Sequence, residues 1–160
     1  MKFRKRRGTE TELIKGCINK FRGETGFETD KFSLFADKFN KVSIYNGMPV
    51  SLANLGALSI GMCIGKFEKD NTFIPSREFM EVIKPTAYVF EITDVINAVN
   101  FMKGQNIGNE KKDYMIYTKE KLNFEENALI AIKYKGMVLG VGKFSNGIII
   151  NKISKRKKFH

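Results

Sequence analysis

The sequence predicts an α+β fold made of two domains, residues 1–85 and 86–160. Apolar residues recur at helical spacing near the N-terminus, and they alternate with polar residues from residue 31 onward. Beyond Pro85 most segments have the pattern of short strands. A chain of 160 residues can hold two small domains. Because no low-complexity linker separates the halves, we expect the N-terminal domain, with an antiparallel sheet, to pack directly on the C-terminal one.

The first expected element is an amphipathic helix over residues 10–22. Thr9 and Glu12 have the spacing of a capping box, in which each side chain accepts a backbone N–H at the start of a helix. Gly23 is a typical stop signal. The residues at helical spacing, which we expect to face a core, are Leu13, Ile14, Cys17, Ile18 and Phe21.

The rest of the first half alternates between strand and helix patterns. Two antiparallel strands are predicted around residues 31–34 and 42–45, with a turn at 37–40 between them. A short helix is expected over 50–55. Residues 58–67 are apolar but interrupted by Gly61 and Gly65, which predicts a buried strand with close backbone neighbours. Ser76 is placed to cap a helix that contains Phe79 and that ends at Pro85.

The second half is dominated by predicted strands, interrupted by one helix over residues 95–102. Lys135-Gly136 and Asn146-Gly147 are turn signals between the last three strands. Short strands on tight turns predict a small barrel or sandwich. The expected strands are residues 88–93, 114–117, 129–134, 138–144 and 148–153.

The positive charge of the chain is concentrated at its two ends. The formal net charge is +11, from 28 basic and 17 acidic residues. Residues 1–7 and 152–160 each carry five cations and no acid, so the remainder has 18 basic and 17 acidic residues. Such clusters indicate a polyanionic partner. The cations are Lys2, Arg4, Lys5, Arg6 and Arg7 at one end, and Lys152, Lys155, Arg156, Lys157 and Lys158 at the other.

RNA is the polyanion that these clusters favour. Each cluster contains a phenylalanine, Phe3 or Phe159, and RNA-binding surfaces combine cations for phosphates with aromatic rings for bases. A solubilising tail is the alternative, and a membrane-surface patch is weaker because no adjacent amphipathic helix or acylation signal supports it. The N-terminal cluster, separated from the predicted helix by Gly8, is expected to be the more mobile of the two.

Motifs for catalysis, cofactors or metals are missing from the sequence. The glycine-rich stretches 61–67 and 136–144 have the wrong spacing for a phosphate loop, and no Ser or Thr follows the lysine. The single histidine is His160, so the usual pairs of a nucleophile with a histidine base are missing. A zinc site needs about four ligands, and with Cys17 and Cys63 as the only thiols such a site is close to excluded. Both cysteines stand among apolar residues, so we expect both to be buried. We expect no enzymatic activity, no cofactor and no small-molecule substrate.

No membrane association is expected either. The longest mostly apolar stretch, residues 58–64, is much shorter than the roughly 20 residues that span a bilayer. The basic N-terminus runs directly into polar residues, unlike a secretory signal. We therefore expect a soluble, intracellular protein.

Several segments resemble the Nip-seven family of ribosome-biogenesis factors, known from eukaryotes and archaea. The most specific is Ser59–Lys69, followed by Phe73 and the helix that ends at Pro85. The likeness continues through residues 101–107 and the hairpin at 135–142, and this second half resembles a PUA domain, an RNA-binding module. The chain departs from the family pattern after Ile153, where it has a Lys/Arg run.

The resemblance implies an N-terminal α/β domain on a C-terminal PUA pseudo-barrel without enzymatic activity. It implies binding of ribosomal RNA precursors, in single-stranded segments, and of pre-ribosomal proteins during large-subunit assembly. The location would be cytoplasmic in an archaeon and nuclear or nucleolar in a eukaryote. The family's RNA surface includes basic residues near the end of the last strand, here Lys152 and Lys155–Lys158, and the helix-to-strand loop with Lys103 and Gly104.

Two other functions remain open from the sequence. One is that of a stand-alone PUA subunit that presents RNA to a separate modifying enzyme, such as a cytosine methyltransferase. The chain would also suit a protein–protein adaptor whose basic tails only confer solubility.

Overall fold

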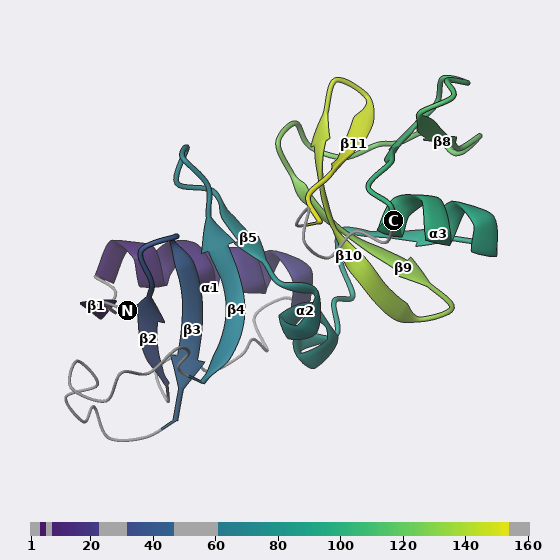
Figure 1. Ribbon diagram of the computed structural model, residues 1–160. Helices are drawn as coiled ribbons and strands as arrows, with labels where there is room; N and C mark the ends of the chain where they lie inside the picture. The colour runs from purple at the N-terminus through teal and green to yellow at the C-terminus, as the bar shows by residue number, and fades with distance from the viewer. Residues whose placement is uncertain (1–3, 6–7, 23–31, 47–60, 154–160) are drawn as a thin grey trace. The chain divides into compact units, whose positions relative to one another are not determined.

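The computed structural model describes residues 4–5, 8–22, 32–46 and 61–153 (Figure 1). The chain divides into two compact units, Met1–Ile83 and Lys84–His160, so the division falls two residues before Pro85. The first unit combines helices with an antiparallel sheet, and the second carries one helix on a curled, mixed sheet. The class is α+β.

The first unit is a five-stranded meander with two helices. The strands pair in the order β1-β2-β3-β4-β5, and every neighbouring pair is antiparallel. Helix α1 lies across one face of the sheet (Figure 1). The elements are β1 (Arg4–Lys5), α1 (Gly8–Arg22), β2 (Ser33–Ala36), β3 (Lys41–Tyr45), β4 (Met62–Phe67), β5 (Phe73–Pro75) and α2 (Arg77–Ile83).

Helix α1 confirms the predicted amphipathic helix, with differences at its start. Ile14, Ile18 and Phe21 are buried at helical spacing, whereas Leu13 is half exposed. The helix begins at Gly8, so Thr9 lies within the first turn and does not cap it; the predicted capping box is wrong. The expected separation of the N-terminal cations from the helix by Gly8 is also wrong, because Gly8 is helical.

Strand β1 was not predicted, since two charged residues carry no strand signal of their own. Arg4 pairs with Ala36 and Lys5 with Phe35, so the backbone of this part of the N-terminal cluster is an edge strand on β2. This segment is extended because it pairs with β2, since its own sequence has no strand pattern.

Strands β2 and β3 confirm the predicted antiparallel pair and its turn. Leu34 pairs with Ile44 and Ala36 with Val42, and all four side chains are buried. In the turn, Asp37 Oδ1 accepts the backbone N–H groups of Phe39 and Lys41 at 2.8 and 3.0 Å. Short side chains that accept backbone N–H groups in this way favour turns.

Strand β4 contains a bulge that explains its glycine and its burial. The register against β3 shifts between Val42, opposite Gly65, and Ser43, opposite Cys63. The extra residue changes which side chains face the core, so Ile64 and Phe67 are both buried. A Cβ on Gly65 would collide with the Ile74 carbonyl oxygen, which confirms the predicted close backbone approach.

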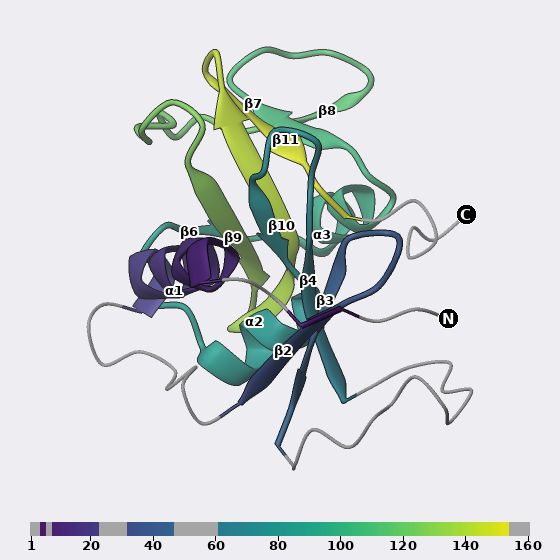
Figure 2. The same cartoon turned by 90° about the vertical axis from the view of Figure 1, so that its left-hand side faces the viewer.

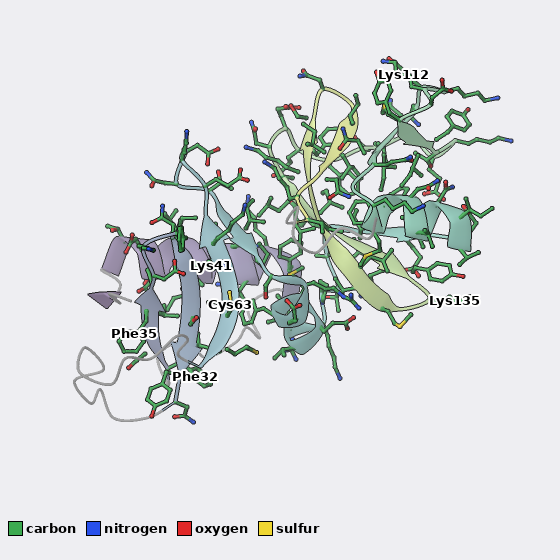
Figure 3. The ribbon with its side chains drawn as sticks, viewed as in Figure 1. Phe32, Phe35, Lys41, Cys63, Lys112 and Lys135 are labelled. Carbon is green, nitrogen blue, oxygen red and sulfur yellow. The ribbon has the colours of Figure 1, made fainter. Side chains whose placement is uncertain are left out.

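The bulge also overturns the expected burial of Cys63. Cys63, labelled in Figure 3, is exposed, whereas the next residue, Ile64, is fully buried. Cys17, on α1, is partly covered, and burial raises the pKa of its thiol to about 12, against a smaller lowering by Lys20. The predicted helix over 50–55 and the first residues of the predicted strand 58–67 lie outside the described residues.

Helix α2 confirms the predicted cap and stop. The Ser76 hydroxyl accepts the Phe79 N–H at 3.1 Å and donates to the Cys63 carbonyl oxygen at 3.0 Å, which ties the helix start to β4. The helix ends at Ile83, and Lys84 takes a positive φ of 49° before Pro85. A residue that precedes proline is disfavoured in the helical region, so the helix cannot continue.

The second unit is a six-stranded mixed sheet in the order β6-β9-β10-β11-β7-β8. The pairs β6/β9 and β7/β8 are parallel, and the other pairs are antiparallel. Strand β11 thus lies between β10 and β7 (Figure 2). The elements are β6 (Val89–Ile92), α3 (Val95–Met102), β7 (Asn106–Gly108), β8 (Met115–Tyr117), β9 (Leu129–Tyr134), β10 (Met137–Ser145) and β11 (Ile148–Asn151).

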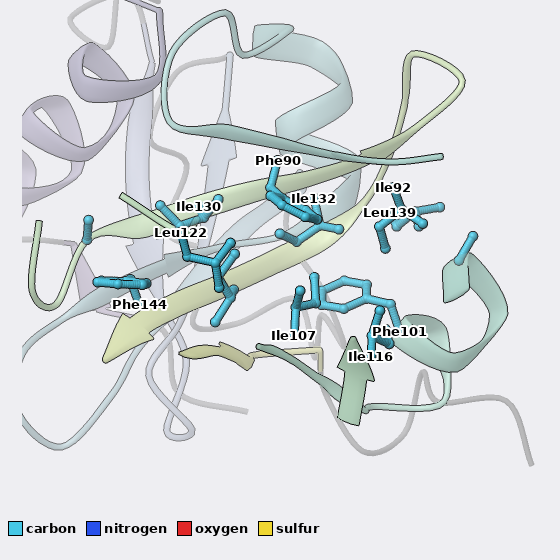
Figure 4. Close-up of a cluster of buried hydrophobic side chains, with 13 residues drawn as sticks. Phe90, Ile92, Phe101, Ile107, Ile116, Leu122, Ile130, Ile132, Leu139 and Phe144 are labelled. Atoms are coloured by element: carbon cyan, nitrogen blue, oxygen red, sulfur yellow. The ribbon is translucent and has the colours of Figure 1, made fainter. Parts of the chain in front are cut away.

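This unit confirms the predicted helix 95–102 and the five predicted strands, and it adds β7. Lys135-Gly136 and Asn146-Gly147 have positive φ at both positions, the geometry of the predicted two-residue hairpin turns. The core (Figure 4) contains Phe101 from α3, which packs with side chains from five strands: Phe90, Ile107, Ile116, Ile132 and Ile149.

Candidate nucleic-acid interface

The structure describes three of the predicted RNA-binding residues in full: Lys103, Gly104 and Lys152. Arg4 and Lys5 form β1 in the first unit. Arg6, Arg7, Lys155, Arg156, Lys157 and Lys158 lie outside the described residues. The geometry available for the site is therefore that of the second unit, at the end of α3 and the end of β11.

The loop after α3 is fixed by the way the helix ends. Gly104 has φ of 98°, which glycine adopts without the steric cost that other residues meet. Its N–H donates to the Phe101 carbonyl at 2.8 Å, and the Gln105 N–H donates to Asn100 at 3.0 Å. These two bonds are those of a Schellman motif. Lys103, one residue before the glycine, is consequently held at the surface with its side chain exposed.

Asn151 ties this loop to the end of β11. Its side-chain amide donates to the carbonyl oxygens of Phe101, at 2.7 Å, and of Gln105, at 3.2 Å. Its backbone N–H donates to Asn106 Oδ1 at 2.9 Å, and its own Oδ1 accepts the Ile153 N–H at 2.8 Å. One partly buried side chain therefore joins three segments and brings Lys103 and Lys152 to the same end of the unit.

The chain is anchored as far as Ile153, the last residue that the structure describes. The Lys152 N–H donates to the Val141 carbonyl at 2.9 Å. The Ile153 side chain packs on the core against Gly140, where an added Cβ would lie 2.7 Å from Ile153 Cγ1. Gly140 thus makes room for Ile153, and the Lys155–Lys158 run begins two residues beyond this anchor.

Sequence reasoning pointed to Lys103, Gly104 and Lys152 as candidates, but it gave no role to Asn151 and Asn106, whose side chains join these segments. Their role depends on where α3, β7 and β11 meet, which no local pattern states. The only signal was that Asn151 is an uncharged polar residue directly after the apolar run Ile148–Ile150. A buried polar group normally has hydrogen-bond partners, so such a residue suggests a structural contact without identifying it.

The glycine-rich stretches have structural roles in the described residues. Gly65 lies in the β4 bulge, Gly136 in a hairpin turn, and Gly142 under the side chain of Ile149. Within the part of the chain that the structure describes, no three His, Cys, Asp or Glu side chains are grouped as metal ligands would be. In the same residues, no helix is long and apolar enough to cross a membrane.

Comparison with known proteins finds a likeness to solved structures. No family model matches the chain, and no curated protein does. Among solved structures, the chain resembles a conserved PUA domain protein from Thermoplasma acidophilum with a TM-score of 0.55 and 13% identity. The alignment covers 90% of this chain and 80% of that one.

The chain has a PUA-type fold. Because the alignment covers nearly the whole chain, the likeness extends to both units. At 13% identity it concerns the arrangement of the backbone. The PUA resemblance of the second half is thus confirmed as to fold, and the Nip-seven resemblance stays a prediction.

Proposed function

We propose that this protein binds RNA through the end of the second unit where α3, β7 and β11 meet. The observation that carries the proposal is the Asn151 junction, which ties the two ends of the Lys103–Gly104 loop, at Phe101 and Gln105, to the residue before Lys152. Cations on separate segments contact several phosphates of one strand best when the backbone already fixes their spacing. The basic run Lys155–Lys158 follows directly in sequence, and the PUA-type fold supports the same role.

The more specific part of the proposal is a non-catalytic role in large ribosomal subunit assembly. It is supported by the sequence likeness of Ser59–Lys69 and residues 101–107 to the Nip-seven family. The RNA would be a ribosomal precursor, and pre-ribosomal proteins would be partners. The protein alone would hydrolyse no ATP or GTP and would have no nuclease or methyltransferase activity.

The RNA proposal predicts a steep salt dependence of binding. Fluorescence anisotropy with a labelled single-stranded RNA gives the association constant K over a series of salt concentrations. If four to five C-terminal cations contact phosphates, log K should fall with log salt at a slope of about −3 to −3.5, from about −0.7 per contact. A flat response would contradict the electrostatic account and favour an adaptor with solubilising tails.

The ribosomal proposal has its own test. The protein should co-sediment with pre-large-subunit particles, and in-cell crosslinking followed by sequencing should recover ribosomal RNA precursors. Crosslinks confined to RNAs that a separate enzyme modifies, with no co-sedimentation, would favour the accessory-subunit function.

A further inference from the structure

Tyr114 is an aromatic residue that lies largely uncovered just before β8. Its side chain is 64% exposed, although the next two residues, Met115 and Ile116, are buried. The Met115 N–H donates to the Lys112 carbonyl at 3.0 Å, so a tight turn holds the backbone on both sides of the tyrosine. The ring is therefore presented from a fixed backbone, and ordering it on a ligand costs little conformational entropy.

The loop that carries Tyr114 is braced at its far end as well. Asn109 donates from its side-chain amide to the carbonyl oxygens of Thr118, at 2.9 Å, and Glu120, at 2.7 Å. The Thr118 N–H donates to the Gly108 carbonyl at 3.0 Å. The β7–β8 connection is thus closed by hydrogen bonds at its base.

The sheet register places Tyr114 at the same end as the proposed RNA interface. Strands β7 and β8 are parallel, with Asn106 opposite Met115. Tyr114 therefore lies beside Gln105, the residue that follows Gly104 and whose carbonyl oxygen accepts from Asn151. The basic end of β11, the α3–β7 loop and the start of β8 succeed one another across this end of the sheet.

The charges around Tyr114 are mixed. Lys112 forms an ion pair with Glu110, and Asp113 is exposed next to the ring (Lys112 is labelled in Figure 3). A hydrogen bond and the charge of Glu110, with a smaller contribution from Tyr114, raise the pKa of Lys112. With a carboxylate on each side, this loop lacks the cation excess of a phosphate site. The Tyr114 ring, 64% exposed, offers an aromatic face instead.

We propose that the Tyr114 ring stacks on an unpaired base of RNA bound at the adjacent basic surface, which contains Lys103 and Lys152. This inference rests on the proposed function, and it specifies the ligand as single-stranded, since paired bases offer no free face to a side chain. The phosphates would lie on Lys103 of the α3–β7 loop and on Lys152, which follows β11. Stacking on an aromatic ring tolerates any base, so binding would have little sequence preference.

Tyr117 provides a matched control in the same strand. It is 38% exposed, but the Lys111 ammonium lies over its ring, 5.4 Å from the centroid. Its register partner is Gly108, at the opposite end of β7 from Gln105. A tyrosine on β8 that is away from the basic surface should contribute little to RNA binding.

The test is anisotropy with a single-stranded RNA at one salt concentration. Tyr114→Leu should weaken binding about tenfold, the usual scale of one stacked base, whereas Tyr114→Phe and Tyr117→Leu should stay within about twofold of the wild type. The salt slope of Tyr114→Leu should equal that of the wild type, because no cation is removed. Thermal melts monitored by circular dichroism identify a variant that has lost its fold.

A second arm changes the RNA and leaves the protein intact. Replacing its bases with abasic sites should weaken wild-type binding and should abolish the difference between wild type and Tyr114→Leu. Equal affinities for the two proteins on the unmodified RNA would overturn the inference and leave the proposed function standing. An absence of RNA binding by the wild type would overturn the proposed function itself.

Discussion

Asn151 makes four hydrogen bonds at the proposed interface, although it carries no charge. The four hydrogen bonds of its side chain and backbone hold the ends of α3 and β11 and the start of β7 in one arrangement. A lysine at position 152 or 103 can contact phosphate only where this junction puts it. The geometry of the proposed site thus depends on the Asn151 side-chain amide, whereas its positive charge comes from Lys103 and Lys152.

Replacing Asn151 with alanine should lower both stability and RNA affinity. The carbonyl oxygens of Phe101 and Gln105 and the Ile153 N–H would lose their partner in a partly buried position, which typically costs about 1–3 kcal/mol. Urea unfolding measures the loss. RNA binding should weaken although the net charge is unchanged.

Asn123→Ala is the control for this variant, because the Asn123 side chain is exposed in the same unit. Its free energy of unfolding should stay within about 0.5 kcal/mol of the wild type. If both variants lose the same stability, the junction does not have the structural role described for it.

At the scale of elements, glycine has opposite effects in β4 and in α1. Gly65 sits in the bulge, where an added Cβ would meet the Ile74 carbonyl and the Phe73 ring. Gly16 is an exposed residue inside α1 with no atom within 4 Å of its would-be Cβ. Replacement of glycine by alanine therefore tests packing at position 65 in β4 and helix propensity at position 16 in α1.

Gly65→Ala should destabilise the first unit by about 1–3 kcal/mol, the usual cost of forcing an atom into a packed site. Gly16→Ala should stabilise it by about 0.5–1 kcal/mol, because alanine loses less backbone freedom in a helix than glycine does. Urea unfolding of both variants gives the two changes. A destabilised Gly16→Ala protein, or an unaffected Gly65→Ala protein, would contradict the described environments.

The success of sequence reasoning differed between elements for physical reasons. Helices α2 and α3 and the hairpin at Lys135-Gly136 were predictable because caps, stops and turn residues act locally. Strands β1, β5 and β7 have two or three residues each, too few to show a period, and they exist through their partners. The exposure of Cys63 follows from a bulge that depends on the pairing of β3 and β4.

The candidate site was predictable in part for a related reason. The charge clusters were visible in composition, and the family resemblance indicated Lys103 and Gly104. What joins them is a set of hydrogen bonds between residues about 45–50 positions apart, which a local pattern cannot show. Tyr114 was missed because an exposed tyrosine and a buried one look the same in a sequence.

For the whole molecule, the two basic ends should contribute unequally to RNA binding. We expect replacement of Lys155, Arg156, Lys157 and Lys158 by alanine to weaken binding more than replacement of Arg4, Lys5, Arg6 and Arg7. The C-terminal run follows a segment anchored beside Lys103. The sequence also predicted that the N-terminal cluster is the more mobile one, which would weaken its contribution. That prediction does not hold for Arg4 and Lys5, because their backbone is paired in β1.

Filter binding of the two quadruple variants at one salt concentration decides this comparison. Each removes four cations, so any difference reflects position and not charge. Neither should shift the melting temperature much, because solvated surface charges contribute little to stability. Equal losses would mean that only the number of charges matters, and a larger N-terminal loss would place the RNA surface on the first unit.

The position of β11 between β10 and β7 has a consequence for biosynthesis. The β7–β8 pair is translated long before β11, yet it joins the main sheet only through that strand. While the ribosome is still extending the chain toward residue 148, β7, β8 and the loop with Tyr114 have no sheet to dock on. Domains fold as units during synthesis, and contacts between distant segments form late. The nascent protein therefore completes the end of the sheet proposed to bind RNA only after β11 has emerged.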